Sequence, residues 1–404
     1  MNPAAHSTRT IVLCFLTALL EGFDLQATGI AAPYLSKAFE LSPGMLGWVF
    51  SAGLLGLLPG AFAGGWLADR VGRKRVLAGA VLLFGGFSLG TACAWDFHSL
   101  LLARLLTGLG LGAALPILIA LAAEAVEPRL RSTAVSLTYC GVPLGGAAAS
   151  LIGLSGLGAD WHVVFYAGGA APLLVAAALA LWLAESSAFS QQVAPGIGVG
   201  AGLFGERRAS RTLLLWLACF FTLTVLYMLL NWLPSLLMGQ GFSRPQAGAV
   251  QVLFNLGGAA GSFVTGRLMD KGRARAAVAI AYLGMLAALA GLGLLSRFEW
   301  MLAAGCLAGY CAIGGQLVLY ALAPTLYPTG CRATGVGAAV AVGRLGSMAG
   351  PLAAGQILAA GAGVGGLLGA ASPGLVVAAI AALSLLRQRP RTASAPMAEP
   401  ARQI

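Results

Sequence analysis

Long apolar runs separated by short polar segments repeat along the whole chain of 404 residues. Each run has about 20 residues, the length that an α-helix needs to cross the hydrocarbon core of a bilayer. A transmembrane β-barrel gives shorter segments of alternating polarity, so this pattern predicts helices. We expect twelve helical spans, at about 10–34, 44–68, 76–95, 99–123, 132–157, 163–184, 211–236, 245–268, 276–296, 299–324, 333–359 and 366–386.

The composition supports this interpretation. Hydrophobic residues make up 59% of the chain and charged residues only 9%, whereas about a quarter of a soluble domain is charged. The mean hydropathy is +0.87. The sequence therefore predicts an all-α membrane protein. The first run carries two acids and is not followed by a cleavage pattern, so we expect a retained helix there.

The basic residues orient the chain in the membrane. Most of the 24 Lys and Arg residues lie in alternate loops and in the two tails. They are Arg9, Arg70, Arg73, Lys74, Arg75, Arg129, Arg131, Arg207, Arg208, Arg211, Arg267, Lys271, Arg273, Arg275, Arg332, Arg387, Arg389, Arg391 and Arg402. The opposite loops hold only Lys37, Arg244 and Arg297. Because cytoplasmic loops carry the basic excess, both termini are expected in the cytoplasm. The net charge of +11 then indicates orientation, and nucleic acid is not an expected partner.

The chain repeats itself after about 200 residues: GGWLADRVGRKRVL at 64–77 resembles TGRLMDKGRARAAV at 265–278. The matched positions are Gly65 with Gly266, Asp69 with Asp270 and Gly72 with Gly272. Such parallel repeats are a known plan of transporters. We therefore predict an N-terminal six-helix half (1–184), a cytoplasmic linker (185–210), a C-terminal six-helix half (211–386) and a disordered cytoplasmic tail (387–404).

The loop at 65–75 reads G-x-x-x-D-R-x-G-R-K-R. Glycines permit close helix approach and a sharp reversal, and the basic cluster suits an anionic membrane surface. The loop resembles the signature between the second and third helices of the major facilitator superfamily. That resemblance implies the major facilitator fold and a latch between the two halves in the outward-facing state. The latch candidates are Gly65, Asp69, Arg70, Gly72, Arg73 and Asp270.

Two acids lie within the first apolar run. Glu21 and Asp24 are three positions apart in EGFDLQATG, so we expect them on nearly the same helix face. Gly22 leaves room beside them for a neighbouring helix. Ionised groups inside a membrane span are costly and indicate a functional site with a partner.

Two arginines also lie within apolar spans. Arg104 is near the start of the span at 99–123, where it either serves a functional site or extends to the outer surface. Arg344 is near the middle of the span at 333–359, too deep to reach water easily. Its planar fork matches a carboxylate with two parallel hydrogen bonds, so it either anchors an anionic substrate or forms a structural ion pair.

These charges narrow the resemblance. The stretch RLLTGLGLGAALP (104–116) resembles the superfamily signature R-x-x-x-G-x-G-x-G, which is linked there to proton coupling. The E-G-x-D motif, this Arg104 and Arg344 together resemble the aromatic acid:proton symporters, over nearly the whole chain except linker and tail. Most members have Asp where Glu21 stands. The resemblance implies proton-coupling roles for Asp24, Glu21 and Arg104 and a substrate-binding role for Arg344.

Several polar or amphipathic residues interrupt the other apolar runs. Each is able to stack on an aromatic ring or to bond a phenol hydroxyl, but each is equally suited to bridging helices. The substrate-binding candidates are Tyr139, Tyr227, Asn231, Trp232, Gln251, Asn255, Gln316 and Tyr320.

The expected function is uptake of an aromatic carboxylic acid, of the phenylpropionate or benzoate type, by proton symport with alternating access. The expected location is the inner membrane, where the chain acts as a monomer in the lipid bilayer. The seven cysteines form no CxxC and no nucleophile stands with a His base, so no metal, no cofactor except the coupling proton and no enzyme activity are expected. A proton-coupled exporter of the same fold and a transporter-like sensor are the alternatives. GVPLGG (141–146), a near miss of the antiporter motif, favours uptake.

Overall fold

The computed structural model describes residues 3–127, 131–154, 160–185, 203–205, 208–327 and 332–387. In these residues, twelve helices are long and apolar enough to cross a membrane, which confirms the predicted spans. They are α1 (Pro3–Ala38), α2 (Pro43–Val71), α3 (Arg73–Ala92), α4 (Phe97–Glu124), α5 (Arg131–Leu154), α6 (Trp161–Trp182), α8 (Ala209–Gly239), α9 (Arg244–Asp270), α10 (Ala274–Leu294), α11 (Phe298–Leu322), α12 (Arg332–Ala359) and α13 (Gly363–Arg387). Several begin or end a few residues beyond the predicted runs, because polar flanks continue a helix outside its apolar part.

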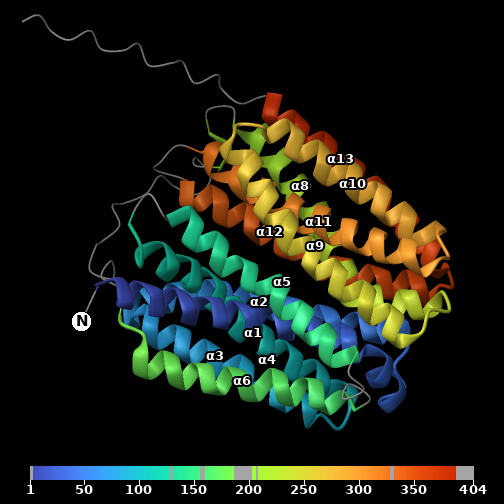
Figure 1. Ribbon diagram of the computed structural model, residues 1–404, viewed down its shortest axis with the longest axis horizontal. Coiled ribbons are helices and arrows are strands. Elements are labelled where there is room, and N and C mark those ends of the chain that lie inside the picture. The colour runs from blue at the N-terminus through green and yellow to red at the C-terminus, as the bar shows by residue number, and fades with distance from the viewer. Residues whose placement is uncertain are drawn as a thin grey trace, which may run out of the picture.

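The helices form two bundles that lie one above the other in Figure 1, α1 to α6 below and α8 to α13 above. In the first bundle α2 packs on α4, α1 on α5 and α3 on α6. In the second, α9 packs on α11, α8 on α12 and α10 on α13. In each bundle the second helix packs on the fourth, the first on the fifth and the third on the sixth. The repeat seen in the sequence is therefore also a repeat in packing. The predicted linker and tail lie mostly outside the described residues.

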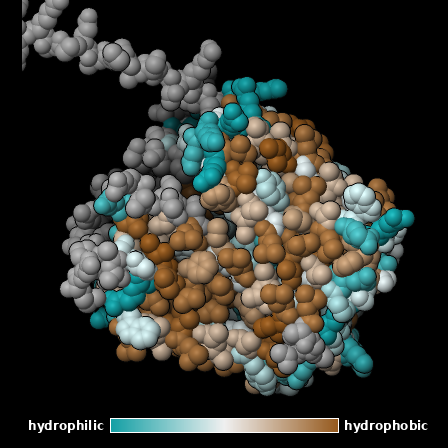
Figure 2. Space-filling model, in the orientation of Figure 1, coloured by the Kyte–Doolittle hydropathy of each residue, from teal (hydrophilic) through white to brown (hydrophobic). Residues whose placement is uncertain are grey.

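The outer surface of the bundle is apolar. Figure 2 shows hydrophobic side chains across the middle of the face in view and hydrophilic ones gathered toward its edges. Phe62 is 82% exposed, Leu174 74% and Leu294 82%. A soluble monomer rarely exposes large contiguous apolar patches, so this surface suits lipid chains. The molecule is a multi-pass membrane protein.

Glycines set the helix spacing inside each half. A Cβ atom on Gly108 of α4 would lie 1.8 Å from the carbonyl oxygen of Gly53 of α2. A Cβ atom on Gly309 of α11 would lie 1.7 Å from the carbonyl oxygen of Phe254 of α9. These are equivalent contacts in the two halves. Small residues that bring backbones together are the usual basis of helix packing in membranes.

The two halves touch each other toward one end of the bundle. We call this end, where α1 ends and α2 begins, the far end, and the end with the basic loops the basic end. Ser51 Oγ of α2 donates to the carbonyl of Met348 of α12 at 2.8 Å. The Phe50 ring packs edge-on against Trp232 of α8, with centroids 5.1 Å apart. These contacts lie on the far-end portions of their helices.

The glycine contacts give a stability prediction. Gly108→Ala and Gly309→Ala should each lower the free energy of unfolding by about 1–3 kcal/mol, since the added methyl displaces a neighbouring backbone. Gly79→Ala is the matched control, because no atom lies within 4 Å of its Cβ position on α3, and Ala favours helix more than Gly. Melting temperatures of the purified proteins in detergent check this. Equal values for all three variants would show that these contacts do not limit packing.

Candidate functional site

A buried ion pair lies inside the first half. Arg104 Nη2 of α4 donates to Asp24 Oδ2 of α1 at 2.9 Å, and Arg104 Nη1 donates to Asp24 Oδ1 at 3.3 Å. Ser88 Oγ of α3 donates to Asp24 Oδ1 at 2.8 Å. Asp24 is 0% and Arg104 4% exposed. Arg104 therefore does not extend to the surface, and the interpretation as a snorkelling residue is wrong. The guanidinium of Arg104 thus forms a bidentate pair with the Asp24 carboxylate, a geometry that stabilises its negative charge.

Glu21 faces a different part of the molecule. Its side chain is 1% exposed, and its Oε2 atom has no hydrogen-bond partner among the described residues. The positive charge that acts on it belongs to Arg344 of α12, in the second half. At 3.6 residues per turn, three positions leave the two acids about 60° apart around α1. We expected nearly the same face, but this angle is enough to direct Asp24 and Glu21 to different cations.

Arg344 is the central cation of the second half. It is 8% exposed, and its Nη1 donates to the Tyr227 hydroxyl of α8 at 2.8 Å. Its charge also interacts with Glu21, Tyr139 and Tyr320. Among the described residues, no carboxylate lies within ion-pair distance of Arg344. The interpretation of Arg344 as one member of a structural ion pair is therefore not supported.

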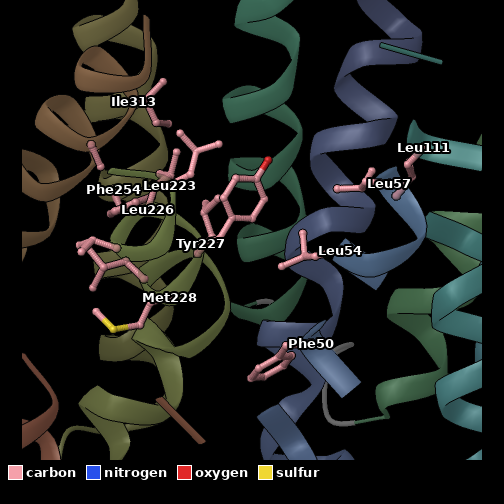
Figure 3. Packing of buried hydrophobic residues seen from close by; sticks show 14 of the residues in the cluster. Phe50, Leu54, Leu57, Leu111, Leu223, Leu226, Tyr227, Met228, Phe254 and Ile313 are labelled. Carbon is pink, nitrogen blue, oxygen red and sulfur yellow. The ribbon is translucent and has the colours of Figure 1, made fainter. Parts of the chain in front are cut away.

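A small cavity lies between the halves next to Tyr227, the residue that is hydrogen-bonded to Arg344. Its volume is about 30 Å³, roughly the share of one water molecule. The lining residues come from α1 and α5 of the first half and from α8 and α11 of the second: Gly22, Leu25, Gln26, Tyr139, Val142, Pro143, Leu226, Tyr227, Leu230, Ile313 and Gln316. Figure 3 shows Tyr227 projecting from α8 toward the side where Leu54 and Leu57 of α2 lie. Aromatic, amide and apolar groups thus share one cavity.

Besides Arg344, eight substrate-binding candidates were predicted. The structure brings four of them together at the cavity, places Asn231 and Trp232 elsewhere, and puts Gln251 and Asn255 in an amide cluster with Gln26. Tyr139, Tyr227 and Gln316 line the cavity, and Tyr320 accepts from Gln316 Nε2 at 3.1 Å.

Asn231 and Trp232 do not line the cavity. Asn231 Nδ2 donates to the carbonyl of Tyr227 at 2.8 Å, and Trp232 Nε1 donates to the carbonyl of Pro351 at 3.0 Å. Both side chains find these partners within the second half. Their predicted contact with substrate stays a prediction without structural support.

Sequence reasoning missed Gln26. This side chain of α1 crosses to α9 of the second half: Gln26 Nε2 donates to Asn255 Oδ1 at 2.7 Å, and Gln26 Oε1 accepts from Gln251 Nε2 and Asn255 Nδ2, each at 2.8 Å. The signal was a polar residue inside an apolar run, the same criterion that selected Gln251 and Asn255. It was overlooked because two acids precede it in the same motif.

The predicted latch loop forms a sharp reversal at the basic end. Gly72 has φ 105°, and its counterpart Gly272 has φ 70°, a region that favours glycine. The Arg73 guanidinium pairs with Glu124 of α4. The guanidinium of Arg70 lies 3.9 Å from the centroid of the Trp66 ring.

Other latch candidates fit less well. No atom lies within 4 Å of a Cβ placed on Gly65, so the expected close helix approach there is wrong. The Asp69 side chain lies outside the described part of the structure, and Asp270 is exposed at the end of α9. The latch role therefore stays a prediction. Within the described residues, no group of His, Cys, Asp or Glu suits a metal ion.

Comparisons with known proteins agree with this architecture. The 3-(3-hydroxy-phenyl)propionate transporter of Escherichia coli (strain K12) is 55% identical over 395 residues, which cover 96% of this chain and 97% of that protein. The 4-hydroxybenzoate transporter PcaK of Pseudomonas putida is 37% identical over 391 residues, 88% of this chain and 87% of that protein. The xylose transporter XylE from E. coli, in a partially occluded inward open conformation, superposes with a TM-score of 0.75 at 16% identity, covering 96% and 99% of the two chains. That structural likeness shows the fold.

The family itself is shown by sequence. The profile of the Major Facilitator Superfamily matches residues 14–351 and 237–403, which together span both halves. The relatives are transporters, in keeping with a twelve-helix bundle that holds buried charges between two halves. This chain is a transporter, not an enzyme, and it belongs to the Major Facilitator Superfamily.

Proposed function

We propose that this protein takes up an aromatic carboxylic acid, 3-(3-hydroxyphenyl)propionate or a close phenylpropionate or benzoate analogue, by proton symport. The observation that carries the proposal is Arg344, a buried guanidinium whose described hydrogen bond goes to the neutral hydroxyl of Tyr227, beside a cavity of tyrosines and amides. The two relatives named above, whose printed names are those of aromatic acid transporters, support it. The protein acts as a monomer in the inner membrane, with the basic end in the cytoplasm and the proton as its only coupling partner.

The substrate carboxylate binds to Arg344. A guanidinium has five N–H donors, and Tyr227 accepts from one of its nitrogen atoms, so a fork remains for a carboxylate. The aromatic ring lies between Tyr139, Tyr227 and the apolar wall. A cavity of about 30 Å³ is too small for such a ligand. The halves therefore move apart to admit it, as in rocking of two repeats around a central site.

Glu21 couples the proton to the substrate. Both Glu21 and the incoming carboxylate act on the same cation, Arg344. Two carboxylates that share one site disfavour each other's charged forms, so Glu21 is neutral when the substrate is bound. The resemblance implied proton coupling by Asp24 and Arg104 as well as by Glu21. The geometry favours Glu21, because Asp24 is already matched by Arg104 and Ser88, whereas Glu21 Oε2 has no hydrogen-bond partner among the described residues.

We infer that the site opens toward the basic end, because described contacts between the halves lie toward the other end. The contacts between halves at Ser51 and Phe50 lie toward the far end, which the positive-inside rule places outside the cell. Opening to the outside therefore requires these contacts to break, while the predicted latch loop at the basic end closes. The two latch copies are related by the internal repeat.

Uptake into vesicles tests the proposed function. Radiolabelled 3-(3-hydroxyphenyl)propionate should accumulate above the outside concentration when the outside is made acidic, and an uncoupler should abolish the accumulation. Accumulation that persists with the uncoupler would exclude proton symport. Accumulation only under the reversed gradient would favour the exporter, and binding without any accumulation would favour a sensor.

The variants Glu21→Gln and Asp24→Asn should both lose uphill accumulation of substrate, but they should differ in substrate exchange and in melting temperature. Gln resembles a protonated Glu, so Glu21→Gln should lose uphill accumulation but keep exchange of labelled for unlabelled substrate. Asp24→Asn leaves Arg104 buried without its carboxylate, a loss of about 3–5 kcal/mol, so its melting temperature should fall as well. Exchange and melting measurements separate the two. Uphill uptake by Glu21→Gln at the wild-type level would remove Glu21 from its assigned role.

Arg344→Lys should weaken substrate binding about 10- to 100-fold, because the lysine keeps the charge but loses the planar fork, and charge-assisted hydrogen bonds contribute about 1.5–3 kcal/mol. The dissociation constant of the purified variant measures this. Arg297→Lys, at an exposed position next to α11, is the matched control and should bind as the wild type does. Equal affinities of both variants would mean that the substrate carboxylate binds elsewhere.

A further inference from the structure

Three amide side chains form a hydrogen-bonded cluster between the halves. Gln26 of α1 is 2% exposed, and Gln251 and Asn255 of α9 are 0% exposed. Their side-chain hydrogen bonds measure 2.7 to 2.8 Å. Gly146 of α5 makes room for the cluster, because a Cβ atom there would lie 1.8 Å from Gln26 Nε2. The cluster is therefore built by helices of both halves.

The cluster forms one wall of the central cavity. Gln26 lines that cavity together with Tyr139 and Tyr227. It stands five positions beyond Glu21 on α1, which is about 7.5 Å along the axis at 1.5 Å per residue. Tyr227 of this lining accepts a hydrogen bond from Arg344, so one lining residue leads to the cation and another, Gln26, belongs to the neutral amide cluster. We call the Gln26 side of the cavity its amide end. The rest of the lining contains aromatic rings and apolar side chains.

The amide end has hydrogen-bonding capacity left over. Gln26 Nε2 has two N–H groups and donates to Asn255 Oδ1, which leaves a donor. Gln251 Oε1 is buried and has no hydrogen-bond partner among the described residues. A hydroxyl group both donates and accepts, so it suits a wall that offers a spare donor with an unpartnered acceptor behind it. A second carboxylate would find no cation at this end, and burying an unmatched charge is costly.

We propose that Gln26, supported by Gln251 and Asn255, is a specificity-determining subsite for a hydroxyl group on the substrate's aromatic ring. The inference rests on the proposed function, with the substrate carboxylate at Arg344. The subsite selects phenolic acids over unsubstituted ones, because an acid without the hydroxyl leaves the buried amide groups unpaired.

The test compares two acids in one protein. The wild type should bind 3-(3-hydroxyphenyl)propionate about 10-fold more tightly than 3-phenylpropionate, the factor that corresponds to one net hydrogen bond. Gln26→Met keeps the length of the side chain and removes its amide, and should bring the ratio of the two dissociation constants to about one. Because the cluster also joins the halves, this variant shifts the balance of conformations. Such a shift scales both affinities by the same factor, so the ratio reports the hydroxyl contact alone.

Gln356→Met is the matched control, since Gln356 of α12 is an exposed amide that also lies near the other half, at Gly44 of α2, but does not line the cavity; it should leave the ratio unchanged. A wild-type ratio in Gln26→Met, or loss of the ratio in Gln356→Met instead, would overturn the subsite. Where Gln26→Met does not fold, Gln251→Met replaces it and should lower the ratio at least threefold; an unchanged ratio there overturns the subsite equally. A wild type that binds both acids with equal affinity overturns the subsite but leaves the proposed function standing. A wild type that binds neither acid overturns both.

Discussion

The cost of an unmatched charge inside a membrane protein is the constraint on which this structure depends. Two acids and two arginines lie in the apolar interior, and their arrangement is unequal. Asp24 and Arg104 satisfy each other within the first half, so they join α1 to α4 as one unit. Glu21 and Arg344 belong to different halves and act on each other without a direct contact. The matched pair needs no further partner, whereas the separated pair is the one on which the proposed binding of substrate and proton depends.

The two halves repeat in backbone but not in chemistry. Equivalent helices pair in both, and glycines at Gly108 and Gly309 bring equivalent backbones together. The polar residues differ: the first half supplies both acids, and the second supplies Arg344. In the proposed mechanism, a ligand between the halves therefore meets the proton carrier Glu21 on one side and the cation Arg344 on the other. In that mechanism, rocking of the halves changes the distance between these groups and so links the proton to the conformational change.

Much of the fold was predictable because membrane helices have a strong local signal. Apolar runs of the right length predicted every span, and the repeat predicted the two equivalent bundles. The expected close approach at Gly22 is confirmed, since a Cβ atom there would lie 1.9 Å from the carbonyl oxygen of Val142. The same reasoning was wrong at Gly65, where open space surrounds the Cβ position. A glycine makes close helix packing possible, but whether a neighbouring helix lies close to it depends on the tertiary structure.

By itself, the sequence determined which charges and amides lie within the apolar spans, because polarity within an apolar run is a local property. It did not determine their partners. Whether Asp24 or Glu21 meets Arg104 depends on the rotation of α1 against α4, and Gln26 reaches Asn255 across more than 200 residues of chain. Trp232 belongs to the contact between halves and not to the cavity for the same reason. Partners of this kind follow from how helices rotate and cross, which is settled by the packing of the whole bundle and by no single segment.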